Sequence, residues 1–157
     1  MKKEILITAM KASISDVLET MFFLPVDFSD NGEIDRLWGN KKDQIKIAKL
    51  NFEGPFSGYA FFYIPQELAL SITADFMGED KEKVSDLQVE GTVNEITNML
   101  VGNTFSLYDP QAVFNLDTPE LIRFEELHKD SPDADSTISI VIETPENHMA
   151  FQMNIKG

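Results

Sequence analysis

The chain of 157 residues contains no cysteine, and this absence excludes several kinds of chemistry. Without thiols there is no disulfide framework, no cysteine nucleophile and no thiolate ligand for zinc. Basic residues are scarce as well, because 13 Lys and Arg stand against 27 Asp and Glu, for a net charge of −14. Nucleic acids and anionic membrane surfaces bind basic proteins, so we expect neither as a partner.

Long apolar runs are also missing. The apolar run from Ile5 to Met10 ends at Lys11, too early for a secretory signal or a membrane-spanning helix. We therefore expect a cytoplasmic protein with no membrane partner. The length, with 43% hydrophobic and 25% charged residues, is that of an ordinary globular chain and predicts a single domain over residues 1–157.

Three segments have the apolar spacing of helices. The first long helix is predicted over Ile5–Phe23, where these apolar residues recur at intervals of three or four: Ile7, Met10, Ile14, Val17 and Met21. The second long helix is predicted over Asp86–Leu107. A shorter helix is expected over Gln66–Met77, between Pro65 and the terminator Gly78. Its apolar side is expected to hold Leu68, Ile72 and Phe76.

Strand patterns fill the remaining segments. Two antiparallel hairpins are predicted at Gln44–Phe52 with Tyr59–Ile64, and at Ser136–Thr144 with Met149–Ile155. Short strands are predicted at Val26–Asp30, Ala112–Asp117 and Glu120–Leu127. Each half of the chain thus has a long helix, a short strand and a hairpin, offset by 76 residues when Glu19 is set against Glu95. We predict an α+β fold in which two long helices and a shorter one pack on a mostly antiparallel sheet, with an internal pseudo-repeat.

The second long helix carries two opposed stripes, and Ser85 with Gln88 fits a capping box at its start. The apolar stripe, which must face the core, consists of Val89, Val93, Ile96 and Leu100. The other stripe lies about 200° away, toward solvent, and consists of Gly91, Glu95, Asn98 and Gly102.

Glycine inside a helix costs about 1 kcal/mol relative to alanine. Close approach by another surface is one physical reason to tolerate Gly91 and Gly102, which would then be clearances for a docked partner beside Glu95 and Asn98. The alternative is a solvated helix face with incidental polar residues, which wheel geometry alone favours.

The segment Glu95-Ile96-Thr97-Asn98, followed by Met99, Gly102 and Asn103, resembles the signature helix of the CheC/CheX phosphatases of bacterial chemotaxis. The family pattern is Asp or Ser, three residues, Glu, two residues, Asn, and a proline further on. Glu95 and Asn98 match, Pro119 lies at a suitable distance, and Gly91 replaces the leading Asp or Ser.

The first helix tests whether the pattern occurs twice. Ser15 and Glu19 fit it, but Phe22 stands at the asparagine position, and phenylalanine cannot orient a water molecule. We therefore expect this half to be inactive. One functional site per chain resembles the single-site CheX branch rather than two-site CheC.

The resemblance implies an activity, a partner and roles for the ridge residues. The substrate would be the aspartyl phosphate of a CheY-like response regulator, with Asn98 positioning the attacking water and Glu95 contacting a partner lysine. The chain would hold no cofactor, because the magnesium belongs to the regulator, and it would form a homodimer through a sheet edge. The alternative is a CheX-like docking module that binds a regulator without hydrolysing it.

Two other features carry weaker signals. Asp27 to Asp35 follows the spacing of a calcium loop, but Trp38 stands where an EF-hand needs a bidentate glutamate, so a polar turn is favoured over a calcium site. The histidines, His128 and His148, fall in no recognisable triad and are interpreted as surface residues.

Overall fold

A computed structural model describes residues 1–29, 34–130 and 137–156. The strands are β1 Asp27–Ser29, β2 Ile45–Glu53, β3 Ser57–Pro65, β4 Asn115–Leu116, β5 Glu120–Ile122, β6 Thr137–Glu143 and β7 His148–Lys156. They form one sheet in the order β1-β6-β7-β3-β2-β4, with β5 also beside β2, and every pairing is antiparallel. Both predicted hairpins are present, and β3 with β7 joins them.

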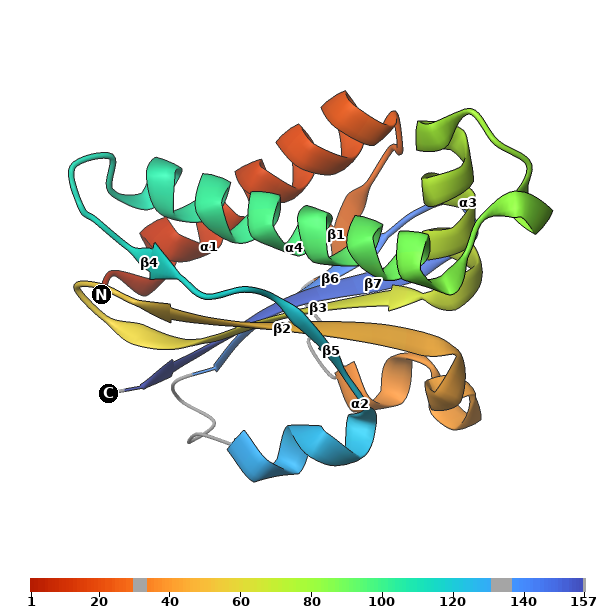
Figure 1. Cartoon of the computed structure of the whole chain (residues 1–157). Coiled ribbons are helices and arrows are strands. Elements are labelled where there is room, and N and C mark those ends of the chain that lie inside the picture. The colour runs from red at the N-terminus through yellow and green to blue at the C-terminus, as the bar shows by residue number, and fades with distance from the viewer. Residues whose placement is uncertain (30–33, 131–136, 157) are drawn as a thin grey trace.

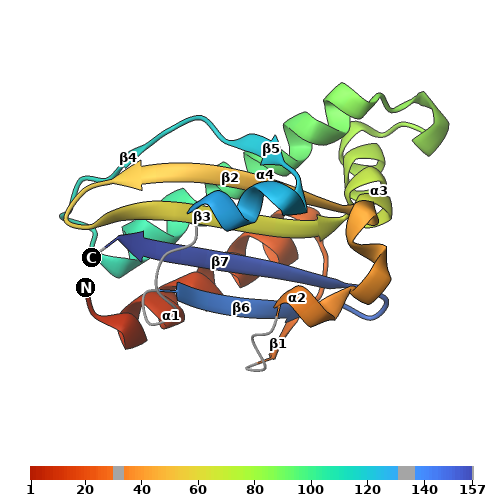
Figure 2. The ribbon, with the colours of Figure 1, turned by 90° about the horizontal axis from the view of Figure 1, so that it is seen from below.

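Helices cover both faces of the sheet. They are α1 Lys3–Ile14, η1 Ser15–Met21, α2 Ile34–Leu37, η2 Gly39–Gln44, α3 Gln66–Met77, η3 Lys81–Lys83, α4 Asp86–Tyr108 and η4 Phe124–Asp130. Figure 1 shows α1, η1, α3 and α4 on one face, which we call the helix layer. The view from below places α2, η2 and η4 on the opposite face (Figure 2). The predicted α+β fold is therefore confirmed.

The main core lies between the sheet and the helix layer. All four residues of the predicted apolar stripe of α4 are buried there. A second, smaller cluster on the other face of the sheet includes Phe61 and Tyr63, with Trp38 and Phe124 packed against it. Successive residues of a strand point to opposite faces, so the dense aromatic run of β3 supplies both clusters at once.

The first predicted helix is continuous from Lys3 to Met21, but its last seven residues, η1, form a π-helix. The wider i→i+5 turn changes which residues face the core. Leu18 is fully buried, whereas Met21, the last residue of the apolar helical spacing, is exposed. Phe22 replaces Met21 in packing against the main core.

Helix α3 has the predicted bounds and ends at Gly78, whose φ of 65° is the left-handed conformation that glycine adopts readily. Leu68 and Ile72 pack against the main core, but the prediction for Phe76 is wrong, because its side chain is 69% exposed. Eight residues at 3.6 per turn rotate Phe76 about 80° past Leu68, which carries it off the core side.

The strand predicted over Glu120–Leu127 ends at Ile122, and the chain continues as the 3₁₀-helix η4. Phe124 and Leu127 are three residues apart, so one 3₁₀ turn brings both against the second cluster. An ion pair between Arg123 and Glu126, 3.4 Å apart, spans the same turn. The strand predicted over Ala112–Asp117 is reduced to the two residues of β4.

Candidate functional site

Helix α4 is fixed at its start and along its length. The predicted capping box is present: the Gln88 N–H donates to Ser85 Oγ at 3.1 Å, and the Ser85 N–H donates to Gln88 Oε1 at 2.8 Å. Further along, the buried Ser13 hydroxyl donates to the carbonyl of Leu100 at 2.8 Å, which ties α4 to α1. These contacts give the outer face of α4 a defined position on the sheet.

The outer face of α4 bears the four residues of the predicted polar stripe, which we call the ridge: Gly91, Glu95, Asn98 and Gly102. Gly91 and Glu95 are exposed, while Asn98 and Gly102 are half-buried. Glu95 and Asn98 are three residues apart on a regular helix, so their Cβ atoms are about 5–6 Å apart on the same side. Neither side chain has a hydrogen bond or ion pair within the described part of the chain, so both are available to a partner.

The ridge glycines serve no internal packing. A Cβ atom on Gly91 would meet nothing within 4 Å. A Cβ on Gly102 would meet Leu116 Cδ1 at 3.8 Å, an ordinary van der Waals contact. Both positions would therefore accept a side chain in the isolated molecule, and their openness agrees with the interpretation of clearances for a docked surface.

Asn94 is a neighbour of the ridge that sequence reasoning missed. It lies one turn before Asn98, and its Oδ1 atom is enclosed without a hydrogen-bond partner among the described residues. Its four-residue spacing from Asn98 was the available sequence signal, but periodicity could not show that its oxygen is enclosed.

The corresponding positions in the first half lie on η1. Ser15 is half-buried and Glu19 is exposed, as a surface pattern requires. The ring of Phe22 lies 5.8 Å from the ring of Phe76 and packs against the main core. The third position of this half is thus used for packing, and it offers no amide to a ligand.

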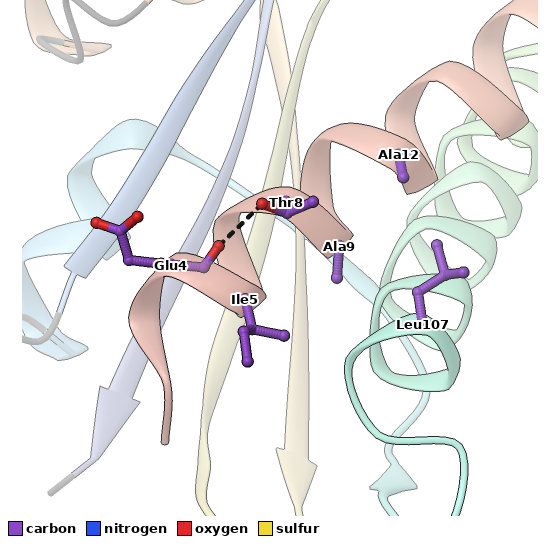
Figure 3. Close-up of a pocket in the computed structure, with 6 residues that line it drawn as sticks. All are labelled: Glu4, Ile5, Thr8, Ala9, Ala12 and Leu107. Carbon is purple, nitrogen blue, oxygen red and sulfur yellow. Dashed lines mark hydrogen bonds between the residues drawn. The ribbon is translucent and has the colours of Figure 1, made fainter.

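An open groove of about 390 Å³ lies between α1 and the end of α4 (Figure 3). Its lining consists of Glu4, Ile5, Thr8, Ala9, Ala12 and Leu107. The Thr8 hydroxyl is already bonded to the Glu4 carbonyl at 3.0 Å. The lining is largely aliphatic and includes no ridge residue, so we assign no chemistry to the groove.

The remaining candidates add little to the ridge. The calcium-like stretch from Asp27 to Asp35 falls partly outside the described residues, so that alternative stays untested. His148 is exposed, with Nε2 4.0 Å from Glu143 Oε1. Within residues 1–29, 34–130 and 137–156, no group of three or more His, Asp or Glu side chains could hold a metal ion. None of the helices described is long and apolar enough to cross a membrane.

Solved structures similar to this chain share its fold at low sequence identity. A chemotactic CheC-like protein from Shewanella oneidensis MR-1 is 21% identical, with a TM-score of 0.74 over 99% of this chain and 100% of that one. A chain of the CheX-CheY-BeF₃-Mg²⁺ complex from Borrelia burgdorferi is 17% identical, with a TM-score of 0.71 over 96% and 97%. Chemotaxis protein CheX from Vibrio vulnificus is 18% identical, with a TM-score of 0.71 over 96% of both chains.

Sequence comparison identifies the family. Curated protein sequences give no match. Residues 47–143, which include α3, α4 and the whole ridge, match the family described as chemotaxis phosphatase CheX. This span is more than half of the 157 residues. The chain therefore belongs to the chemotaxis phosphatase CheX family.

Proposed function

We propose that this protein accelerates hydrolysis of the aspartyl phosphate on a CheY-like response regulator. The observation that carries the proposal is the ridge of α4, where a carboxylate and a carboxamide without internal partners stand between two unobstructed glycines. Membership of the CheX family supports it. So does the structural neighbour from Borrelia burgdorferi, which is a complex of CheX with CheY, BeF₃ and Mg²⁺.

The proposed chemistry needs positioning more than it needs a reactive side chain. An aspartyl phosphate has a good leaving group, so its hydrolysis is limited by the placement of water in line with phosphorus. The Asn98 amide both donates and accepts hydrogen bonds and can orient that water. The water oxygen bonds to phosphorus as the bond to the aspartyl oxygen breaks, and free carboxylate and inorganic phosphate result.

We assign the contact with the regulator to Glu95. Its carboxylate is exposed and unpaired in the described structure, so a lysine of the partner can reach it without first breaking an ion pair. Charge-assisted hydrogen bonds of this kind are stronger than neutral ones. Gly91 and Gly102 keep the helix backbone on either side accessible. We place the magnesium on the regulator rather than on this chain.

A second candidate is a docking module without catalytic activity. Gly91 favours it, because the family pattern has Asp or Ser at this position. The predicted homodimer through a sheet edge is compatible with either candidate: the sheet ends in short strands, β1 on one side and β4 with β5 on the other. The dimer and the cytoplasmic location stay predictions.

The test follows decay of a phosphorylated CheY-like regulator at substoichiometric amounts of this protein. We expect each protein molecule to clear many regulator molecules, with a rate proportional to protein concentration. A pure docking module would instead bind the regulator in proportion to its own amount and release no additional phosphate. Binding without faster phosphate loss would therefore support the docking module over the phosphatase. If the protein neither binds the regulator nor accelerates phosphate loss, the regulator is not its partner.

A further inference from the structure

Four large apolar side chains are exposed where η1 and α3 end: Met21, Phe23, Phe76 and Met77. We call them the helix-end patch. The two ends are in contact, because the rings of Phe22 and Phe76 lie 5.8 Å apart. Figures 1 and 2 show both ends at the end of the helix layer where α4 begins. Single exposed apolar residues are common in proteins, but a group of four on two adjoining ends indicates an interaction surface.

The backbone at Phe23 supports a role outside the folded chain. Its φ is 54°, in the left-handed region, and its side chain is 85% exposed. The turn is closed by a hydrogen bond from the Leu24 N–H to the Leu18 carbonyl at 2.9 Å. Glycine is the usual residue in this conformation at a helix end. An aromatic residue whose backbone is strained and whose ring packs on so little of its own chain points to use by a partner.

Charge on the surrounding helices restricts what that partner is. Helices η1, α3 and α4 contain no Lys, Arg or His. The charged residues of these three helices are all acidic: Asp16, Glu19, Glu67, Asp75, Asp86, Glu90 and Glu95. The connection from α3 to α4 adds Lys81 and Lys83 beside three acidic residues, Glu79, Asp80 and Glu82. A second copy of this chain would bring a like-charged surface to the patch, which is unfavourable. Four side chains are also too small a patch for the interface of a stable dimer. The surface suits an apolar spot with a basic rim on a different protein.

The ridge lies within reach of the same partner. Leu87 is 79% exposed on α4 and stands eight residues before Glu95, about 12 Å along the helix axis. A standard protein interface buries about 800 Å² on each partner, a disc of about 16 Å radius. A protein docked on Glu95 and Asn98 through such an interface covers Leu87 and extends to the helix ends beside it.

We infer that the helix-end patch, together with Leu87, is the apolar anchor by which this protein holds the CheY-like regulator over its ridge. The inference rests on the proposed function and adds to it the surface that supplies affinity. A few well-buried side chains carry most of the binding energy of an interface. The ridge then acts on a regulator that is held elsewhere, so binding and turnover depend on different residues.

The experiment compares a double variant, Phe23→Gly with Phe76→Ser, and the single variant Leu87→Ser with the parent. Val113→Ser is the matched control, because Val113 is 74% exposed and lies in the connection after α4, away from the patch. Affinity is measured by titration calorimetry with a CheY-like regulator carrying beryllofluoride and magnesium. We expect the double variant to bind at least about ten times more weakly, Leu87→Ser several times more weakly, and the control unchanged.

Two further readouts separate docking from folding and from catalysis. Glycine relieves the left-handed backbone at position 23, whereas Phe76→Ser removes the ring contact with Phe22, so the double variant should still unfold cooperatively near the melting temperature of the parent. At saturating regulator its maximal rate of phosphate release should equal that of the parent, with only the concentration dependence changed. A lowered maximal rate at full occupancy would contradict an anchor that acts on affinity alone.

The possible failures are distinct. If the parent accelerates phosphate loss but the double variant binds as tightly as Val113→Ser, the anchor is wrong and the proposed function stands. If the double variant changes the sedimentation of the protein and leaves regulator affinity intact, the patch serves a second copy of the chain, and the inference is overturned. If the parent neither binds nor dephosphorylates the regulator, the proposed function fails and the inference fails with it.

Discussion

Helix α4 carries Glu95 and Asn98, whereas 76 residues earlier η1 carries Glu19, with Phe22 directly after its end at the asparagine position. In α4 the polar residues share the outer face of a regular helix, opposite a stripe of buried residues. In η1 the helix widens into a π-helix, and the third position of the pattern, Phe22, turns to the core and to Phe76. Under the proposed function, a glutamate on a helix surface is not expected to form a site by itself. The amide of Asn98 and an unobstructed approach distinguish the α4 half.

A second lesson comes from the opposed stripes of α4. Stability depends on residues such as Val93, which are buried, whereas the ridge residues make few contacts within the chain. Substitutions on the ridge should therefore leave the free energy of unfolding nearly unchanged. This separation allows the difference between the two halves to be tested by mutation.

The largest effect is expected for Val93→Asp. Val93 is fully buried in the main core, and an aspartate there would be an unpaired charge without water. We expect a loss of about 4 kcal/mol or more in the free energy of unfolding, a large part of the roughly 5–15 kcal/mol that stabilises an ordinary domain. Urea denaturation followed by circular dichroism measures it. A cooperative transition at the parent's midpoint would mean that the apolar stripe is misplaced.

Asn98→Ala should abolish the acceleration of phosphate loss and leave folding intact. Substitutions at positions with few contacts usually change stability by less than about 0.5 kcal/mol, so its urea midpoint should stay close to that of the parent. Its affinity for the regulator should also be close to that of the parent, because the proposed contact with the regulator is made by Glu95 and not by the water-positioning amide. Phosphate release as fast as the parent's would refute the mechanism while leaving the fold as described.

The sequence contained the information for these two predictions because periodicity is a local property. The spacing of Val89, Val93 and Ile96 determines which side of α4 is buried, and the same spacing places Glu95 and Asn98 together on the other side. The capping box of Ser85 and Gln88 is equally local and was predictable for the same reason. The roles of Glu95 and Asn98 stay predictions, since geometry alone does not demonstrate catalysis.

What the sequence could not supply depends on tertiary contacts. Over the seven residues of η1, apolar spacing does not distinguish a π-helix from an α-helix, so the exposure of Met21 could not be predicted. The exposure of Phe23 follows from the way that helix ends, and the enclosed oxygen of Asn94 follows from its surroundings in the fold. In the segment after β5, the residues around Phe124 fit a strand pattern in the sequence. In the structure they form a 3₁₀ turn, because this turn packs Phe124 against the second cluster under the sheet.

Phe22→Asn places the asparagine of the family pattern directly after η1. The variant tests whether this side chain alone creates a second site. We expect no gain in phosphate release, because position 22 turns toward the core and η1 is not a regular α-helix. We also expect a loss of about 1–3 kcal/mol, since the contact with Phe76 and part of the core packing disappear. Doubling of the maximal rate per chain would show that the two halves differ only in this side chain.

Glu95→Ala and Glu19→Ala form a matched pair, because both glutamates are exposed on helices of the same layer. Glu95→Ala should weaken binding of the regulator and reduce its dephosphorylation, since the proposed lysine contact is removed. Glu19→Ala should change turnover by less than twofold. Phosphate release over a range of regulator concentrations separates the two outcomes. Equal losses in both variants would point to general loss of negative charge rather than to a specific contact.

The smallest change is expected for Gly91→Ser, which restores a residue of the family pattern. Serine is a slightly better helix former than glycine, and a Cβ atom here meets nothing within 4 Å, so the variant should gain about 0.5 kcal/mol in stability. Its activity should equal or exceed the parent's. Gly91→Leu is the contrasting variant: it should gain similar or greater stability in the isolated chain, but its larger side chain projects from the ridge into the space kept for the regulator. We therefore expect Gly91→Leu to bind the regulator more weakly while melting later than the parent. If Gly91→Leu binds as tightly as the parent, Gly91 is not a clearance, and the docked regulator does not pass close to the first turns of α4.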